Sequence, residues 1–544
     1  MTNRFDAIVV GGGHNGLVAA HYLARGGLSV QVVERRHVVG GPCGPWAFFP
    51  GYRGAISNSP GSLEPKIARD MELERFGLVY DKPDPAMVHP FPDGRAFVGW
   101  RDRSRIEAEL CKFSRHDIAA YHEIFEFFTR FGKTLGVSLF EPPPTFKEMA
   151  ARLKTSEDEA AFATIMFGNT RDFLDDRLES EEIKVLIAVM CMFGGNYGPS
   201  SPGSLLALLQ RPMSLNSMTV EARHDPRVQP LRGSTGLPRG GMGSVAEAMA
   251  RSITASGVAI RTEAAVVKVK VGAGDRAEGV VLADGEEIDA PLVLSNLNPK
   301  TTLLDLVDAR HLDEDLHTRL DRRRMRGCAF KAVLALGDMP RFRAAPADAV
   351  EAFAACQFRI APSVDHLERG YEDAKNGRPS REPRIMGLTP SVMDPGMAPP
   401  GKHLMSLNCW HAPYHLADGD WATEKERFGQ RIIDTVAEYV PNLKDIIEDT
   451  FFLGPKDLED EFGLVEGHQL HGDMTPAAMF ANRPVPGLAA YRTPVGGLYL
   501  CGSGTWPGGF VSGIPGHNGS HQVLKDLTEA NGLFDAASHG SQRV

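Results

Sequence analysis

The chain opens with two short apolar runs separated by a glycine turn and an amphipathic stretch. The first run, Phe5–Val10, predicts a buried strand and leads directly into the turn Gly11–Gly16. A helix is predicted over about residues 15–25, and a second strand over Ser29–Val33. Strand, glycine turn, helix and strand in this order are typical of a βαβ nucleotide-binding unit.

The pattern then becomes helical. Residues from about 66 to 230 carry apolar positions at helical spacing, including Ser156–Leu174 and Ser180–Phe193. After Gly236 a helix over about Ser244–Ser256 is predicted, and strand-like runs follow it at Val258–Arg261, Ala265–Lys270, Gly279–Leu282 and Leu292–Ser295. The chain therefore returns to α/β patterning after a helical insertion.

The second half of the chain also contains both strand-like and helical patterns. Residues 311–484 alternate strand-like runs, such as Ala329–Leu336 and His403–Cys409, with a long helix over about Trp421–Tyr439. The last 60 residues give a strand, Leu498–Cys501, a glycine-rich turn and a helix toward Leu527. We expect an α/β fold in which a discontinuous Rossmann-type domain (1–65, 231–310 and 485–544 with a C-terminal tail) carries a helical substrate lobe (66–230) and a sheet-bearing substrate lobe (311–484).

The first turn has the chemistry needed to hold a dinucleotide. Gly11 permits the tight turn, Gly13 lets the main chain approach a pyrophosphate, and Gly16 allows close packing of helix on sheet. With His14 and Asn15 these residues surround a helix N-terminus, which favours an anion. Glu34, at the tip of the second strand, is placed to accept hydrogen bonds from the ribose hydroxyls.

The same acid affects cofactor choice. A carboxylate at Glu34 would repel a 2′-phosphate, which argues against NADP, although Arg35 and Arg36 directly after it weaken that exclusion. A second match to the fingerprint, Gly241–Ala246, follows no strand, so we interpret it as structural. NAD(P)H is therefore not an obvious electron partner.

Composition narrows the class of protein. The chain has 544 residues, 42% of them hydrophobic, and a net charge of −10, which argues against nucleic acid as a partner.

The first strand begins at residue 5, so we expect no secretory leader. The longest apolar run, Ile183–Phe193, is too short to span a bilayer and predicts a buried helix. A membrane-dipping patch is the alternative, which leaves a peripheral membrane contact open.

The seven cysteines are scattered singly, at positions 43, 111, 191, 328, 356, 409 and 501. The absence of close pairs argues against a zinc site and against the redox dithiol of flavin disulfide reductases. We expect no metal, and a reducing, cytoplasmic compartment.

Glycine and proline crowd the segment after Glu34, at Gly40–Pro45 and Phe49–Arg53. This composition predicts an irregular loop. Because this loop directly follows Glu34, we interpret it as a loop that covers the cofactor, with Gly41 among the residues that contact it. An ordinary surface loop is the alternative.

Three segments in order resemble the phytoene desaturase-like flavoproteins. They are Val9–Gly16 with Glu34-Arg35, Gly240–Gly243, and Leu498–Gly509, supported by His471–Met474 and Tyr491–Pro494. The branch that contains pyridine nucleotide-disulfide oxidoreductase domain-containing protein 2 is the most similar. The resemblance implies FAD as cofactor.

The resemblance also implies roles for residues far from the first turn. Val266 would offer its backbone to the adenine, and Gly502, Gly513 and Ile514 would lie near the ribityl chain and flavin ring. Trp506 stands where a family member often has histidine, which changes the polarity beside the cofactor and puts transfer of substrate identity in doubt.

The implied chemistry is removal of hydrogen from a small organic substrate. A hydride goes to flavin N5, and a base or water takes the neighbouring proton. His471 and His517 are candidates for proton transfer, and Arg53 for clamping a carboxylate, with structural roles as the alternative for each.

Two other classes of function remain alongside this hypothesis. A redox-neutral enzyme, such as an isomerase, hydratase or lyase, could use reduced flavin catalytically. A non-catalytic flavoprotein would retain FAD as an assembly partner. Oxygen or a quinone is the expected electron acceptor in the leading hypothesis.

Overall fold

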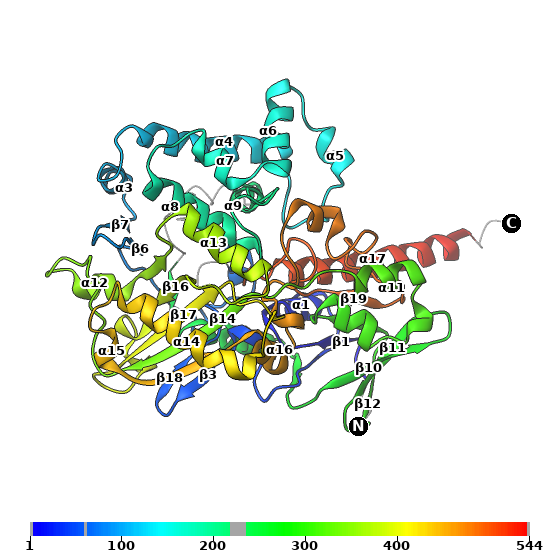
Figure 1. The fold of residues 1–544 in the computed structure, drawn as a ribbon. Coiled ribbons are helices and arrows are strands. Elements are labelled where there is room, and N and C mark those ends of the chain that lie inside the picture. The colour runs from blue at the N-terminus through cyan, green and yellow to red at the C-terminus, as the bar shows by residue number, and fades with distance from the viewer. Residues whose placement is uncertain (1–3, 59–62, 218–235, 541–544) are drawn as a thin grey trace.

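The apolar run at the N-terminus forms the central strand of a parallel sheet. The computed structural model describes residues 4–58, 63–217 and 236–540. Its parallel sheet has the strand order β19–β13–β1–β2–β9. The bounds of these strands are Leu498–Leu500, Leu292–Ser295, Ala7–Val10, Val30–Val33 and Ala259–Arg261. This sheet thus joins both ends of the chain to its middle (Figure 1).

Both faces of this sheet are buried, as expected for a parallel sheet. On one face the helices α1 (His14–Arg25), α10 (Met242–Ala255) and α17 (Ile514–Gly540) pack, with α1 in contact with the other two. On the other lies a small antiparallel sheet of β10 (Val266–Gly272), β11 (Arg276–Leu282) and β12 (Glu287–Asp289). Residues alternate along β1: Ala7 and Val9 join the helix-side core, Ile8 and Val10 the other.

A mixed sheet of seven strands forms the second layer of the molecule. Its order is β18–β14–β17–β16–β15–β6–β7, antiparallel except for the β15–β6 pair. The bounds are Ile447–Leu453, Ala329–Leu336, His403–Trp410, Arg384–Leu388, Gln357–Ile360, Met87–Pro90 and Ala96–Gly99. One face packs on α14 (Trp421–Ala437) through an apolar core that includes Phe330, Leu407 and Phe428.

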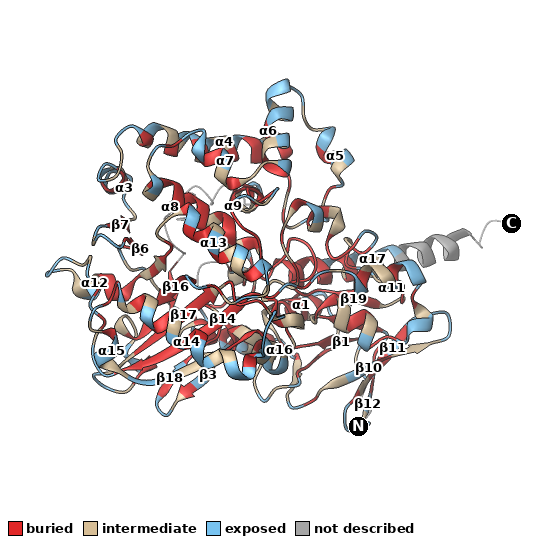
Figure 2. Cartoon of the chain, viewed as in Figure 1, coloured by how far each residue is buried: buried red, intermediate tan, exposed pale blue. Residues whose placement is uncertain are grey.

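A group of helices lies above the two sheets in the view of Figure 1. They are α3 (Arg103–Leu110), α4 (Asp117–Leu135), α5 (Phe146–Ala150), α6 (Ser156–Phe167), α7 (Thr170–Asp175), α8 (Glu181–Cys191), α9 (Leu206–Asn216) and α13 (Val364–Lys375). The Ser180 hydroxyl caps α8 by accepting from the N–H of Ile183 at 3.3 Å. Almost every residue of α8 is buried (Figure 2), so the longest apolar run of the chain lies inside the protein.

The remaining elements are short. They are α2 (Pro65–Asp70), α11 (Glu314–Asp321), α12 (Val350–Ala355), α15 (Leu443–Ile446), α16 (Pro455–Phe462), and the paired strands β3 (Trp46–Phe49) with β4 (Tyr52–Gly54) and β5 (Tyr80–Asp81) with β8 (Leu237–Pro238). Among the described residues, none of the helices is long and apolar enough to cross a membrane.

The structure corrects three expectations about elements. The predicted helix Ser156–Leu174 is two helices, because Gly168 ends α6 and the Asn169 side chain caps α7. Phe49–Arg53, expected to be irregular, lie in the β3–β4 hairpin (residues 46–54) around a turn in which Gly51 has φ +80°. Residues 87–99, inside the range expected to be helical, belong to the seven-stranded sheet. The predicted boundary at 230/231 lies outside the described residues.

The second fingerprint match does not continue a parallel strand. The strand before it in the structure, β8, pairs antiparallel with β5 at a distance from the parallel sheet. A Cβ on Gly241 would meet the Met397 methyl at 2.8 Å. The glycines here serve chain packing, as expected.

The two ends of the chain are held together by a backbone contact between α1 and α17. A Cβ on Gly516 would lie 2.1 Å from the Asn15 carbonyl oxygen. We therefore predict that Gly516→Ala lowers the free energy of unfolding by about 3 kcal/mol, because main chain on both sides must shift. Chemical denaturation measures the change.

Lys525→Ala, an exposed change on the same helix, is the control and should stay within about 0.5 kcal/mol of the native protein. Equal stability of Gly516→Ala and the native protein would show that the contact is not needed.

Candidate functional site

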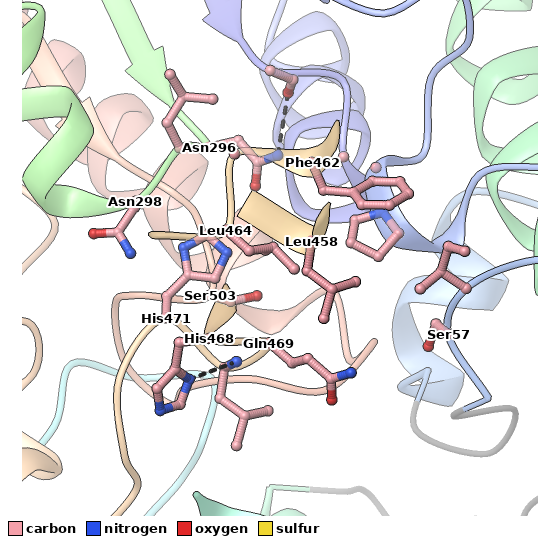
Figure 3. Close-up of a pocket in the computed structure, with 18 of the residues that line it drawn as sticks. Ser57, Asn296, Asn298, Leu458, Phe462, Leu464, His468, Gln469, His471 and Ser503 are labelled. Atoms are coloured by element: carbon pink, nitrogen blue, oxygen red, sulfur yellow. Dashed lines mark hydrogen bonds between the residues drawn. The ribbon is translucent and has the colours of Figure 1, made fainter. Parts of the chain in front are cut away.

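One large cavity lies where the carboxyl ends of the parallel strands face the seven-stranded sheet. Its volume is about 400 Å³, and it reaches from the glycine turn and Glu34 to the sheet residues Met386 and Trp410. The carboxyl edge of a parallel sheet is where ligands of α/β proteins bind. Figure 3 shows polar side chains, among them Asn296, His471 and Ser503, gathered on its wall.

The N-terminus of α1 is open toward this cavity. No side chain caps the helix at Gly13, so its first N–H groups keep their capacity to bind an anion. Gly11 adopts φ +91°, which a side chain would disfavour, and a Cβ on Gly16 would lie 2.1 Å from the Gly11 carbonyl oxygen. Gly11, Gly13 and His14 line the cavity.

Glu34 connects the glycine turn to the second strand. One carboxylate oxygen accepts from the N–H of Gly12 at 2.8 Å, and the other accepts from the N–H of Arg36 at 2.9 Å. The side chain is buried, with 6% exposure, yet lies on the cavity wall. Its remaining lone pairs are available to ribose hydroxyls. Arg35, Gly41 and Val266 line the same end of the cavity.

The C-terminal turn lies directly against this site. The Asn15 amide donates to the Ser503 hydroxyl at 3.1 Å, and Asn15 is 1% exposed. Ser503, Phe510 and Val511 line the cavity. The two ends of the chain therefore build opposite parts of one wall.

Several buried polar atoms here have no hydrogen-bond partner among the residues that the structure describes. They are His14 Nε2, Asn15 Oδ1, His471 Nδ1 and Trp506 Nε1. An unsatisfied buried polar atom costs about 1–3 kcal/mol. Such a cluster beside an open helix N-terminus is typical of a site whose ligand completes the hydrogen bonds.

Two of the histidines that line the cavity, His14 and His471, are neutral. Burial lowers the pKa of His14 to about 4. Burial lowers the pKa of His471 to about 3, and the neighbouring His468 and Arg483 side chains add to the shift. At neutral pH both rings can donate and accept hydrogen bonds, but His471 is a poor acceptor of a full proton.

Five predicted cofactor residues support the cavity from behind its lining. They are Asn15, Gly16, Gly502, Gly513 and Ile514, all buried but outside the lining. A Cβ on Gly502 would lie 2.4 Å from the Asn296 carbonyl oxygen, so this glycine permits close approach of β19 to β13. These residues pack in the chain beside the cavity and do not line it.

Trp506 is fully buried and also outside the lining. Its ring packs on Phe480 with centroids 5.3 Å apart, and its carbonyl accepts from the Tyr491 hydroxyl at 3.2 Å.

The structure does not bring Arg53 and His517 into the cavity. Arg53 lies on β4 as an exposed residue, because alternation along this strand turns Tyr52 and Gly54 inward. His517 lies on α17, packs edge-on against Tyr22 and Phe140, and bonds to the Asn518 side chain at 2.9 Å. Of the three predicted catalytic residues, only His471 lines the site.

Sequence reasoning missed the contribution of β13. Asn296 follows this strand at its carboxyl end, lines the cavity, and donates to the Gly11 carbonyl at 3.3 Å (Figure 3). Asn298 lines it as well. The signal was present, because polar residues just after a parallel strand lie at the ligand edge of the sheet.

The residues at the other end of the cavity were not predicted from the sequence either. Phe193, Met386, Asn408 and Trp410 line the far end of the cavity. Cys43 lines it near the glycine turn, and burial raises the pKa of its thiol to about 12, so it is unsuited to thiolate chemistry.

Comparison with known proteins agrees with this geometry. The model of the flavin-containing amine oxidoreductase family matches residues 16–516. Pyridine nucleotide-disulfide oxidoreductase domain-containing protein 2 of Mus musculus is 33% identical, over 96% of this chain and 94% of its own length. The lycopene-forming phytoene desaturase of a Paracoccus species is 25% identical, over 96% of this chain and 98% of its own length.

The fold has a solved counterpart in wild-type putrescine oxidase bound to putrescine. That structure covers 97% of this chain and 100% of its own, with a TM-score of 0.61 and 15% identity. The predicted α/β fold, with a Rossmann-type domain and a mixed sheet, is confirmed. The glycine cradle, the open helix N-terminus and the unpartnered polar atoms fit a flavin nucleotide.

The close approach at Gly16 gives a test of this fit. Gly16→Ala is predicted to weaken flavin binding about 30-fold, since a Cβ would push the Gly11 carbonyl out of the turn at a cost of about 2 kcal/mol. The ratio of flavin absorbance to protein measures the loss. Arg25→Ala, an exposed change at the end of the same helix, should keep the native ratio.

Burial of neutral His471 makes stability depend on pH. An unfolded histidine binds a proton near pH 6.5, whereas the folded pKa is about 3, so this stability is present above pH 6.5 and is lost as the pH falls toward 3. For His471→Asn, we predict that the fall in unfolding free energy from pH 7 to pH 5 is smaller by about 2 kcal/mol. Denaturation at both pH values measures it.

His317→Asn, at an exposed position, is the matched control and should change nothing. An unaltered pH dependence in His471→Asn would show that this ring titrates normally.

Proposed function

The chain belongs to the flavin-containing amine oxidoreductase family, and from that membership and the site we propose an FAD-dependent oxidoreductase that removes hydrogen from an organic, apolar or unsaturated substrate. The observation that carries this proposal is one cavity that joins the glycine turn and Glu34 to an apolar wall, which includes Trp410 of the seven-stranded sheet and Phe193 from the turn after α8. One end suits a nucleotide, and the other suits an organic molecule.

The nucleotide end supports FAD over a shorter flavin. Gly11, Gly13 and Glu34 form a βαβ site for an adenosine diphosphate, and Val266 lies beside them. The lining continues to Ser503 and Phe510 of the C-terminal turn. A cofactor with an adenine nucleotide at one end and a ring system at the other matches this span.

The substrate end supports an apolar body. Phe193, Trp410, Met386 and Leu470 contribute to its wall, and such surfaces exclude water from a reacting carbon. Bound FAD supplies the hydride acceptor. The relative from Paracoccus is named for desaturation of phytoene, a reaction of this class.

In this proposal the residues of the cavity position the cofactor and substrate by hydrogen bonding, and they do not act as the base. His471 is neutral, with Nδ1 free of any partner in the protein, so it is suited to hydrogen bonding to the cofactor or substrate. Glu34 is the only carboxylate that lines the described cavity, and it lies at the nucleotide end. Water is therefore the acceptor of the neighbouring proton in this proposal, and oxygen or a quinone reoxidises the flavin.

Anaerobic spectroscopy tests the reaction. We predict that an organic substrate bleaches the visible absorbance of the oxidised flavin, and that oxygen or a quinone restores it. NADPH should bleach it far more slowly, because the one dinucleotide turn recognised in the sequence is occupied by FAD in this proposal.

Rapid bleaching by NADPH alone would contradict this assignment of the electron donor. Turnover that requires prior reduction of the flavin, and that consumes no reductant, would instead identify a redox-neutral enzyme.

A further inference from the structure

The cavity face of the seven-stranded sheet carries unpaired positive charge. Side chains alternate along a strand, and Ile385, Leu407 and Cys409 point into the apolar core under α14. The alternate positions, Arg384 on β16 and Arg359 on β15, therefore share the opposite face with the cavity residues Met386 and Trp410. The pairing register agrees, with Arg384 opposite Trp410 and Arg359 opposite Met386.

Arg384 is held directly behind the cavity wall. Its guanidinium lies 4.2 Å from the ring centre of Trp410 and 5.4 Å from that of Phe193, and both rings line the cavity. The residue is 1% exposed, and its Nε and Nη1 have no hydrogen-bond partner in the described part of the chain. Stacking on aromatic faces fixes the guanidinium plane but satisfies none of its N–H groups.

Arg359 approaches the same aromatic ring. Its guanidinium lies 5.4 Å from the Phe193 centre, and its buried Nε and Nη1 also lack partners. The one hydrogen bond of this guanidinium goes from Nη2 to the Gln357 side chain at 3.3 Å. No carboxylate among the described residues forms an ion pair with either arginine, and burial lowers the pKa of each to about 10.

Arg384 is buried and Arg359 is half-buried, and cations removed from water without an anion partner are costly to the folded protein. A ligand that brings the missing negative charge would remove this cost, and the planar fork of arginine is suited to a carboxylate. We propose that Arg384 and Arg359 form an anion subsite at the sheet end of the cavity, and that the substrate places a carboxylate there. This inference rests on the proposed function, because it names the chemistry of the substrate in the same cavity.

Calorimetry with a matched pair of probes tests the subsite on the flavin-loaded protein. Benzoate and its neutral counterpart benzamide have similar size and differ in charge. The native protein should bind benzoate about tenfold or more tightly than benzamide, as expected for charge-assisted bonds to a fork. Arg384→Met should lose this preference, and Arg384→Lys should keep only part of it, since it retains charge without the fork.

Arg369→Met is the control, because Arg369 is exposed and bonds to Glu382 at 2.8 Å outside the cavity. It should keep the native preference. If circular dichroism shows that Arg384→Met is unfolded, Arg359→Met decides, with the same loss expected.

Absence of benzoate binding, equal binding of benzoate and benzamide, or an unchanged preference in Arg384→Met and Arg359→Met would overturn the subsite. Tighter binding of phenyl phosphate than of benzoate would overturn the assignment to a carboxylate. Because calorimetry requires no turnover, an inert flavin with an intact benzoate preference would refute the proposed reaction and leave the subsite standing.

Discussion

The structure depends on one contact between main chains from opposite ends of the protein. Gly516, near the start of the last helix, lies so close to the Asn15 carbonyl oxygen that a Cβ there would be 2.1 Å away. The Asn15 side chain also bonds to Ser503. Together these contacts set the turn that carries Ser503 and Phe510 against the turn that carries Gly11 and Gly13. A shift here would open the wall of the cavity.

Burial then fixes the chemistry of the cavity. His14 and His471, which line it, are neutral because desolvation disfavours their charged forms. The thiol at Cys43 stays protonated for the same reason. Behind the far wall, Arg384 and Arg359 keep their charge because burial lowers the pKa of each only to about 10, and the ring of Phe193 packs against both. The site therefore combines neutral hydrogen-bonding groups near the cofactor end with fixed positive charge near the sheet.

Local sequence predicted much of this fold, because strand, turn and helix signals there reinforce one another. Residues 329–336 form a strand with the expected bounds, and α8 begins after Ser180 as expected. The glycine turn and Glu34 were found from their spacing. Asn296 could have been found from the end of its strand, whereas Arg384 could not, since only the pairing of β16 with β17 places it behind Trp410. Arg53 and His517 have suitable chemistry, but neither lines the cavity. Alternation along β4 leaves Arg53 exposed, and the packing of α17 places His517 against Tyr22 and Phe140.

Hydrogen exchange on flavin-free and FAD-loaded protein tests most directly whether both chain ends enclose one cofactor. The account predicts that FAD slows amide exchange in residues 11–16 and in residues 502–516 together, while β18, which is outside the cavity lining, exchanges at the same rate in both forms. Slower exchange in the first turn with an unchanged C-terminal segment would contradict it.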